Sequence, residues 1–508
     1  MNILGSRFGG VLLHPTSLPG EGGIGELGES AHQWVHWLHA AGLRIWQILP
    51  LGPTGYGDSP YQSFSAFAGN ASLIDLQILV ERGLLRPEDA EFPFEQSPDH
   101  IHYANIIEHK TQALSRAAVR FHKESSSQVL AAYEEFQARN ANWLKDYALF
   151  MALKDFHQGK AWTDWDTPLK VRDANALRIK TAELSTEVND HTFRQFIFFE
   201  QWRALREVAS KAGIKIVGDM PIFVAHDSAD VWTRPDLFQL RRDGRPSVVA
   251  GVPPDYFSKT GQLWGNPLYD WEAHRATNYE WWKARVAALL EIVDVIRIDH
   301  FRGFESYWEI RAGNKTAEVG KWIKAPGAEL FDLLSQELGE LPIIAEDLGL
   351  ITEEVKRLRD ALHFPGMKIL QFAFEGDEDN HYLPHRYPRN CVVYTGTHDN
   401  DTARGWYAAS SKQVKHFSSR YLNTKGEDIA WDLIRAAWAS TSNLAIAPMQ
   451  DFLRLGSEAR MNTPSKAGGN WTWRLRSEEL SSKLADNILE LNRLYGRNPQ
   501  IRENKGDG

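Results

Sequence analysis

The sequence predicts an α/β fold, specifically a (β/α)8 TIM barrel that carries large insertions. Short apolar runs recur along the chain, helical patterns lie between most of them, and polar residues gather where the runs end. Near-continuous apolar runs are typical of parallel strands that are covered on both faces, and their alternation with helices favours a barrel. The eight predicted strands span residues 10–14, 44–51, 214–224, 293–301, 341–349, 367–374, 391–399 and 444–451.

The helical segments fit the connections that a barrel requires. Residues 31–41 repeat apolar side chains at a spacing of three or four before the second strand. Segments 279–292 and 328–339 have the same character on either side of the fourth strand. A TIM barrel is thus preferred over separate smaller domains.

The chain has 508 residues, whereas a minimal TIM barrel needs roughly 250. We expect residues 1–508 to form a single domain, with the surplus in two insertions. Residues 57–192, between strands two and three, form a mainly helical insertion, and residues 225–278 form a loop-rich one. The tail after the last strand is too short for a separate C-terminal β domain, which needs about 100 residues.

The composition argues against several classes of partner. The net charge is −9 and no Lys/Arg cluster stands out, which disfavours nucleic acid and anionic membranes. The single cysteine, Cys391, excludes a disulfide framework and disfavours a thiolate metal site. The N-terminus lacks the apolar core of a signal peptide, so a cytoplasmic location is expected. The 19 tryptophans suit stacking against sugar rings.

Four acidic residues stand at the ends of predicted strands, where TIM barrels carry their chemistry. They are Asp219, Asp299, Glu346 and Asp399. Any one of them could simply cap the following helix. Four carboxyl groups directed at one barrel mouth are costly to desolvate, and this favours a shared functional site.

Two of these carboxyl groups have opposite surroundings. Arg297 and Asp299 are two residues apart on a strand and therefore share a face, so the guanidinium favours the ionised carboxylate of a nucleophile. Glu346 follows an apolar run, and burial there raises the pKa of a carboxyl group, as a general acid requires. Such a pair is typical of glycosidic bond cleavage. Asp399, beside His398, could stabilise a cationic transition state, although His398 could also be purely structural.

Two aromatic segments could line the same mouth. Segment 250–271 is rich in Gly, Pro and aromatic residues, and as a flap it could stack on sugar and exclude water. Alternatively it is a rigid loop on the barrel rim. Segment 52–67 follows the second strand and is rich in Gly, Ser and Tyr. The side chains that could face the cleft are Tyr256, Trp264, Ser59, Tyr61 and Tyr56.

Several long motifs occur in a fixed order along the chain. They are PTGYGDSPYQ (53–62), GDMPIFV (218–224), AGVPPDYFSKTGQLWGNPLY (250–269), VIRIDHFRGF (295–304), AEDLG (345–349) and YTGTHDNDT (394–402). Together they resemble the 4-α-glucanotransferase family, which is also called amylomaltase or disproportionating enzyme and is related to the α-amylases. The resemblance covers nearly the whole chain.

The resemblance implies a retaining enzyme that moves α-1,4-glucan segments between acceptors without a metal or cofactor. It implies Asp299 as nucleophile, Glu346 as acid/base and Asp399 as transition-state stabiliser. We expect maltooligosaccharides and α-1,4-glucans as partners, and a monomer. The resemblance further implies glucan contacts by Arg297, His398, Asp219, Ser59, Tyr61, Tyr256, Trp264 and Asn470, and an outer glucan site at Tyr56.

One position departs from the pattern of some relatives. His226 stands where an acidic residue is expected, just after the third strand, and could alter a sugar contact.

Three other functions remain possible from the sequence. An α-glucan hydrolase would use the same three carboxyl groups and pass the glucosyl unit to water. A magnesium-dependent barrel enzyme of the enolase kind would use them as ligands, but Arg297 on the same face is a poor neighbour for a cation. A sugar-binding regulator would have lost catalysis, which the complete trio disfavours.

Overall fold

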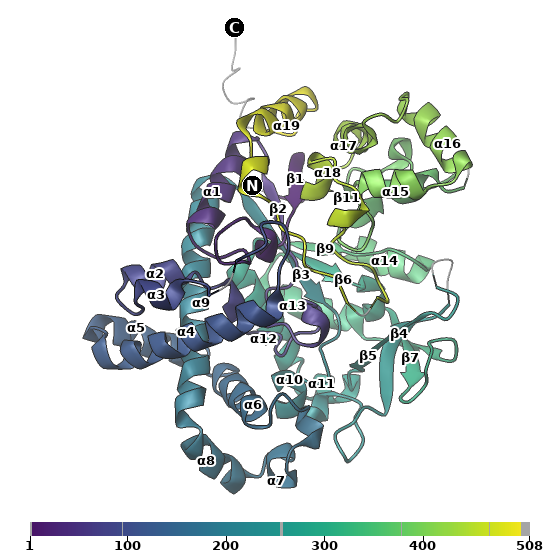
Figure 1. The fold of residues 1–508 in the computed structure, drawn as a ribbon. Helices are drawn as coiled ribbons and strands as arrows, with labels where there is room; N and C mark the ends of the chain where they lie inside the picture. Colours follow the sequence, from purple (N-terminus) through teal and green to yellow (C-terminus); the bar gives the residue numbers. More distant parts are fainter. Residues whose placement is uncertain (1–2, 94, 255–257, 377, 467, 499–508) are drawn as a thin grey trace.

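A computed structural model describes residues 3–498, except residues 94, 255–257, 377 and 467 (Figure 1). In this part of the chain eight parallel strands close into a barrel, in the order β1-β12-β11-β10-β9-β6-β3-β2. The predicted TIM barrel is confirmed. The barrel strands are β1 (Phe8–Leu12), β2 (Ile45–Gln47), β3 (Lys215–Pro221), β6 (Val295–Asp299), β9 (Ile343–Ala345), β10 (Gly366–Ile369), β11 (Cys391–Tyr394) and β12 (Leu444–Pro448).

Burial of the strands on both faces explains their apolar sequences. The residues of β1, β9, β11 and β12 are all buried. The register of β3 against β6 pairs Asp219 with Arg297 and Pro221 with Asp299. This register therefore brings two of the predicted acidic positions to the same end of adjacent strands.

Helices cover the outside of the barrel along most of its connections. Between β10 and β11 the described residues form only the 3-10 turns η7 (Leu370–Phe374) and η8 (Pro384–Arg386). The covering helices are α1 (Glu29–Ala40), α9 (Ser185–Lys211), α12 (Glu280–Ile292), α13 (Gly327–Leu338), α14 (Glu353–Ala361), α17 (Ile429–Ala439) and α19 (Ser482–Leu494). Helices α15 (Ala403–Ala409) and α16 (Lys412–Leu422) stand at the barrel mouth, and α18 (Met449–Phe452) follows β12.

The chain between β2 and β3 forms a group of helices beside the barrel (Figure 1). Lys110 is buried there, and its ammonium group lies 2.5 Å from a Glu26 carboxylate oxygen and donates to the Ile74 carbonyl at 2.7 Å. This ion pair ties the helical segment to the loop after β1. The helices are α2 (Leu76–Glu81), α3 (Pro87–Ala90), α4 (Tyr103–Glu124), α5 (Ser127–Arg139), α6 (Leu144–Phe156), α7 (Thr167–Lys170) and α8 (Ala174–Glu183).

The segment after β3 contributes to a small antiparallel sheet that the sequence analysis did not predict. That segment contains the short helices α10 (Ala229–Thr233) and α11 (Trp271–Ala276) and two strands. The strands pair with two more that follow β6, in the order β5-β4-β7-β8, and the sheet lies beside the barrel (Figure 1). Its strands are β4 (Val248–Val252), β5 (Gln262–Pro267), β7 (Ser306–Arg311) and β8 (Lys321–Lys324).

The barrel closes where its first strand pairs with its last, with Phe8 opposite Leu444. Arg497, which is fully buried, donates hydrogen bonds to the carbonyls of Phe8 at 3.1 Å, Trp438 at 2.9 Å and Asn443 at 3.0 Å. One side chain near the end of the described residues thus links β1 with α17 and with the residue that directly precedes β12. After β12 the described chain forms helices and turns but no strand.

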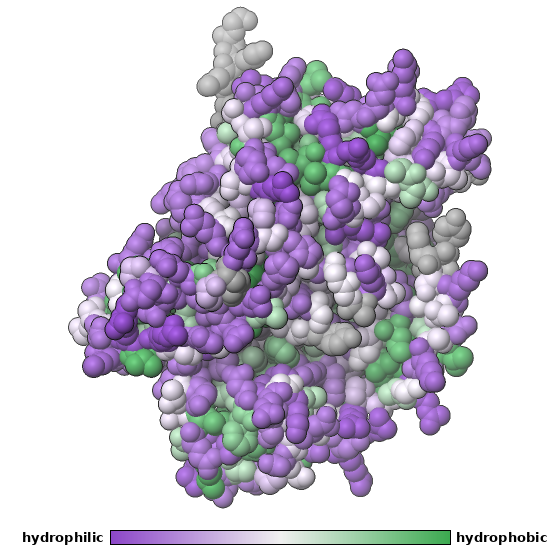
Figure 2. Space-filling view, in the orientation of Figure 1, coloured by the Kyte–Doolittle hydropathy of each residue, from purple (hydrophilic) through white to green (hydrophobic). Residues whose placement is uncertain are grey.

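The visible surface is largely hydrophilic, and apolar residues gather only in small separate areas (Figure 2). Among the described residues, none of the helices combines the length and the apolar character needed to span a membrane.

Candidate active site

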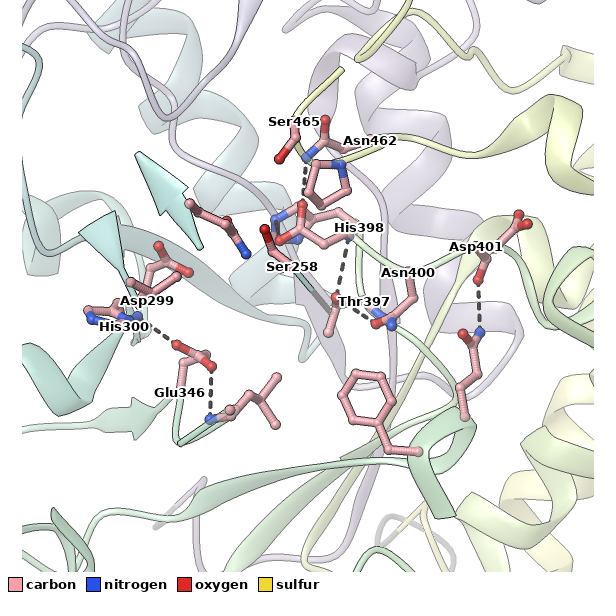
Figure 3. A pocket seen from close by; sticks show the side chains of 18 of the residues that line it. Ser258, Asp299, His300, Glu346, Thr397, His398, Asn400, Asp401, Asn462 and Ser465 are labelled. Carbon is pink, nitrogen blue, oxygen red and sulfur yellow. Dashed lines mark hydrogen bonds and ion pairs between the residues drawn. The ribbon is translucent and has the colours of Figure 1, made fainter. Parts of the chain in front are cut away.

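A cavity of about 1360 Å³ opens at the C-terminal ends of the barrel strands. The barrel, the small sheet, helices α15 and α16, and the segment 460–471 all contribute to its walls. Asp299, Glu346 and Asp399, the three predicted catalytic residues, all line this cavity. In Figure 3, Asp299 and Glu346 lie on one side of it, across from His398 and Asn462.

Arg297 connects two carboxylates at the base of the cavity. Its Nη1 atom lies 2.7 and 2.8 Å from the two Asp219 carboxylate oxygens and 3.0 Å from Asp299 Oδ1. The side chain of Asp219 is completely buried, whereas that of Asp299 is 30% exposed. Asp219 therefore holds Arg297, and Arg297 directs its charge at the carboxylate that faces the cavity.

Glu346 follows β9 and is fixed by backbone groups. The His300 N–H donates to Glu346 Oε2 at 2.7 Å, and the Leu348 N–H donates to Oε1 at 2.9 Å. His300 reaches this position because its backbone is left-handed, with φ 53°, directly after β6. Such a conformation is uncommon for a residue other than glycine and often marks a functional site.

The two carboxyl groups differ in proton affinity. Burial and the nearby charge of Asp299 raise the pKa of Glu346 to about 8. Burial also raises the pKa of Asp299, to about 6, because desolvation outweighs the opposing effect of Arg297. The expectation that Arg297 favours the ionised carboxylate holds in direction, but the sequence did not show how strongly burial opposes it. Glu346 therefore holds its proton more tightly than Asp299 does, which suits the two groups to opposite roles.

Asp399 is the most open of the three carboxyl groups, with a side chain that is 46% exposed. Asn462 donates to its Oδ1 atom at 2.6 Å, and Arg460 donates to its backbone carbonyl at 2.6 Å. His398 Nε2 lies 3.4 Å from Asp399 Oδ2. The carboxylate is therefore oriented by the loop after β12, and Asp399 still lines the cavity.

An aromatic wall stands beside these groups. The Tyr61 ring stacks on His398 at 5.2 Å, and both rings lie 5.9 Å from Trp471. The Tyr61 hydroxyl donates to Asp219 Oδ2 at 2.7 Å. This bond connects the segment after β2 with the Arg297 cluster, so the wall and the carboxylates form one rigid unit.

The other predicted contact residues fall into distinct groups. Ser59, Trp264, Arg297 and His398 line the cavity with Tyr61. Asn470 is absent from the described lining and instead binds its own loop, accepting from Thr463 N–H at 2.9 Å and donating to the Lys466 carbonyl at 2.8 Å. Tyr256 lies outside the described residues, and so does the side chain of Tyr56, although its backbone begins the turn η2 (Tyr56–Asp58).

His226 also lies away from the cavity. Its Nε2 atom is 2.8 Å from the Gly244 carbonyl, and its ring packs against Trp162 at 5.5 Å. Burial lowers the pKa of this histidine. It borders a shallower depression beside Arg241 and Arg245 rather than the main cavity.

Sequence reasoning missed three residues that organise the site, namely His300, Asn462 and Arg460. His300 contributes its backbone N–H, which no side-chain pattern reveals. Asn462 and Arg460 come from a loop more than 60 residues after Asp399, so only the folded chain brings them together.

The fold and site together define a TIM-barrel enzyme with a carboxylate pair suited to glycosidic bonds. A family model described as 4-alpha-glucanotransferase matches residues 13–480. The 4-alpha-glucanotransferase of Thermus thermophilus is 52% identical over 94% of this chain and 96% of its own length. That of Clostridium butyricum is 47% identical over 96% of this chain and 100% of its own length.

Solved structures give the same result. Amylomaltase from Streptococcus agalactiae, in a complex with acarbose, has a TM-score of 0.94 and 41% identity, covering 97% of this chain and 99% of that one. The chain therefore belongs to the 4-alpha-glucanotransferase family. The predicted family and the predicted class of enzyme, a transferase of glucan segments, are confirmed.

Proposed function

We propose that this enzyme transfers α-1,4-glucan segments by a retaining double displacement through a covalent glucosyl-enzyme intermediate. The observation that carries the proposal is that Asp299, beside Arg297, and Glu346, held by two backbone N–H groups, line one cavity, where burial raises the pKa of Glu346 further than that of Asp299. Maltooligosaccharides and starch-type chains are the proposed donors, and glucose or another glucan is the acceptor. The acarbose bound to the Streptococcus agalactiae protein supports a sugar chain as ligand.

In the first step, Glu346 donates its proton to the glycosidic oxygen while an Asp299 oxygen attacks the anomeric carbon. The bond to the leaving chain breaks, and that chain departs with a new hydroxyl group. In the second step, the Glu346 carboxylate takes the proton from an acceptor hydroxyl, whose oxygen attacks the same carbon and releases Asp299. Two inversions leave the configuration retained.

The surrounding residues assist these steps. The open face of the Asp399 carboxylate stabilises positive charge on the sugar ring as the bond breaks. Tyr61, His398, Arg297 and Ser59 hold the ring at the cleavage point, and Asp219 orients Arg297 from beneath. Trp264 adds a stacking surface. Tyr256, Asn470 and an outer site at Tyr56 remain proposed glucan contacts on the strength of the family resemblance.

The deciding experiment incubates the enzyme with maltotriose alone and separates the products by size. A ladder of longer maltooligosaccharides together with glucose indicates transfer. Products that are only shorter than maltotriose would indicate the alternative, an α-glucan hydrolase with the same trio. Treatment with EDTA should leave the rate unchanged, since the proposed mechanism uses no metal.

Asp299→Asn tests the nucleophile. It preserves shape but removes the attacking oxygen, so activity should fall by more than the ~10²–10⁴-fold expected for one acid/base group. Azide added to Asp299→Gly should restore turnover of a donor with a good leaving group, and the product should be the inverted glucosyl azide. Near-normal transfer by Asp299→Asn would contradict the assignment.

The architecture proposed for the chain is one catalytic domain over residues 1–508, with a helical insertion at 57–192, a second at 225–278 and a flap at 250–271. The buried single cysteine supports a reducing, cytoplasmic setting. We also propose a monomer, which sedimentation at micromolar concentration would test.

A further inference from the structure

Trp322, on the edge strand β8 of the small sheet, lines the active-site cavity. Its side chain keeps 38% exposure, which is high for a tryptophan in a folded enzyme. The guanidinium carbon of Arg302 lies 3.7 Å from the centre of the Trp322 ring. Trp308, directly opposite on β7, meets the ring edge-on with centroids 5.2 Å apart. The indole is thus held in place on one face and one edge, while exposed surface remains towards the cavity.

Arg302 links this indole to the loop that follows Glu346. The guanidinium donates to the Leu350 carbonyl, and to Ser306 Oγ at 3.4 Å, and the whole side chain is only 4% exposed. Leu350 follows Glu346 by four residues and also lines the cavity. The Arg302 side chain is buried and its guanidinium is hydrogen-bonded, so it holds the Trp322 ring in one position. Trp322 therefore loses little rotamer freedom when a ligand binds.

The chemistry decides which part of a glucan reaches Trp322. Glu346 must lie next to the glycosidic oxygen, which stays with the leaving chain when the bond breaks. Asn462 lies on the other side of the cavity (Figure 3) and donates to Asp399, the group proposed to act on the donor ring. Trp322 adjoins the loop of Glu346, so a chain that passes it is the leaving chain or, in the second step, the acceptor.

The small sheet separates Trp322 from Trp264, which also lines the cavity. Trp264 is on β5 and packs edge-on against His300 at 4.8 Å, next to the reacting groups. Strands β5 and β8 are the two edges of the sheet, so their axes are about 14 Å apart. A single glucose ring that binds near Trp264 is too small to reach Trp322, whereas a chain of several glucose units can contact both.

We propose that Trp322, held by Arg302, is an outer stacking subsite for the leaving and acceptor chain, and that it makes the enzyme favour long acceptors over glucose. This proposal rests on the transfer function proposed above. It adds a determinant of chain length on the small sheet, outside the carboxylate cluster.

The test compares acceptors of two lengths. With a maltooligosaccharide donor held constant, the ratio of kcat/KM for maltopentaose to kcat/KM for glucose is measured in the wild type, Trp322→Ala and Trp322→Phe. We expect Trp322→Ala to lower the ratio by about three- to tenfold, mostly through KM, and Trp322→Phe to restore much of it. The matched control is Val319→Ala, an exposed residue in the same hairpin, which should keep the wild-type ratio.

Binding measurements separate this subsite from the catalytic proposal. In a Glu346→Gln background, titration calorimetry should show that Trp322→Ala weakens maltoheptaose binding by a similar factor but leaves maltose binding unchanged. An unaltered ratio and unaltered maltoheptaose affinity in a folded Trp322→Ala protein would overturn the subsite. Equal losses for both acceptors would overturn it too. Absence of any transfer by the wild type would instead overturn the proposed function.

Discussion

The pKa values of Asp299 and Glu346 set the pH range of the proposed reaction. The nucleophile must be ionised, so activity is lost as pH falls through about 6, where Asp299 takes up its proton. The acid must be protonated for the first step, so activity is lost as pH rises through about 8, where Glu346 releases its proton. We expect a bell-shaped profile of kcat/KM between these limits.

Glu346→Gln should abolish the alkaline limb of that profile. A donor with a good leaving group, such as glucosyl fluoride, needs no acid and should still form the covalent intermediate, which then accumulates and is detected by intact-protein mass spectrometry. Retention of the wild-type alkaline limb in Glu346→Gln would assign the acid/base role to another residue.

Burial of Glu346 also has a stability cost. Because its pKa in the folded protein lies above the unfolded value, folding stability falls as pH rises from about 4.5 to about 8. Glu346→Gln removes this loss, so its melting temperature relative to wild type should be roughly 2–4 °C higher at pH 9 than at pH 5. The exposed Glu427→Gln is the control. An equal difference at both pH values would show that burial does not perturb this carboxyl group.

At this scale the sequence predicted which carboxyl groups line the cavity but not how they are arranged. The family motifs and the position at strand ends indicated Asp299, Glu346 and Asp399. A residue at the C-terminal end of a barrel strand is placed at the face where the cavity opens. The role of Asp219 as a buried partner of Arg297 depends on the pairing of β3 with β6, which sequence spacing does not show. The sequence also did not show that the Asn470 side chain forms its hydrogen bonds within its own loop.

Among the elements, the small sheet is the one that sequence analysis did not anticipate. Its strands are short and partly exposed, and β4 pairs both with β5 and with β7, which lies beyond a barrel strand. Neither an apolar run nor simple alternation marks such strands. The barrel strands were predictable because both of their faces are buried, which imposes a strong apolar pattern.

The hairpin of β4 and β5 carries Trp264 into the cavity, and this placement predicts a role in choosing sugar over water. Water is present at about 55 M, so an acceptor wins only through binding and exclusion of water. Trp264→Ala should lower transfer more than hydrolysis, and the excess of hydrolysis should shrink at high acceptor concentration. Tyr256→Ala should act in the same direction.

The measurement is the ratio of new reducing ends to glucose released from maltotriose. Leu263→Ala is the control, since Leu263 is the neighbouring residue, is 38% exposed and is not among the residues that line the cavity. Equal losses of transfer and hydrolysis at every acceptor concentration would mean that this hairpin serves donor binding or folding.

The whole molecule depends on closure of the barrel, and Arg497 contributes to it directly. Arg497→Ala removes the donors for buried carbonyls on both sides of the seam, so the free energy of unfolding should fall by about 3 kcal/mol or more. Urea titration measures the change. Arg493→Ala, at an exposed position of α19, should have little effect, and equal stability of the two variants would contradict the structural role of Arg497.

The same seam has a consequence for synthesis of the protein on the ribosome. Phe8 cannot meet Leu444 until the ribosome has added the 436 residues from Gly9 to Leu444, which takes roughly 20–90 s at about 5–20 residues per second. Throughout that interval β1 has an unpaired edge, the kind of surface on which nascent chains associate wrongly. The late pairing of the two ends therefore makes elongation speed and chaperone supply determinants of the yield of folded enzyme, independently of the stability that it finally reaches.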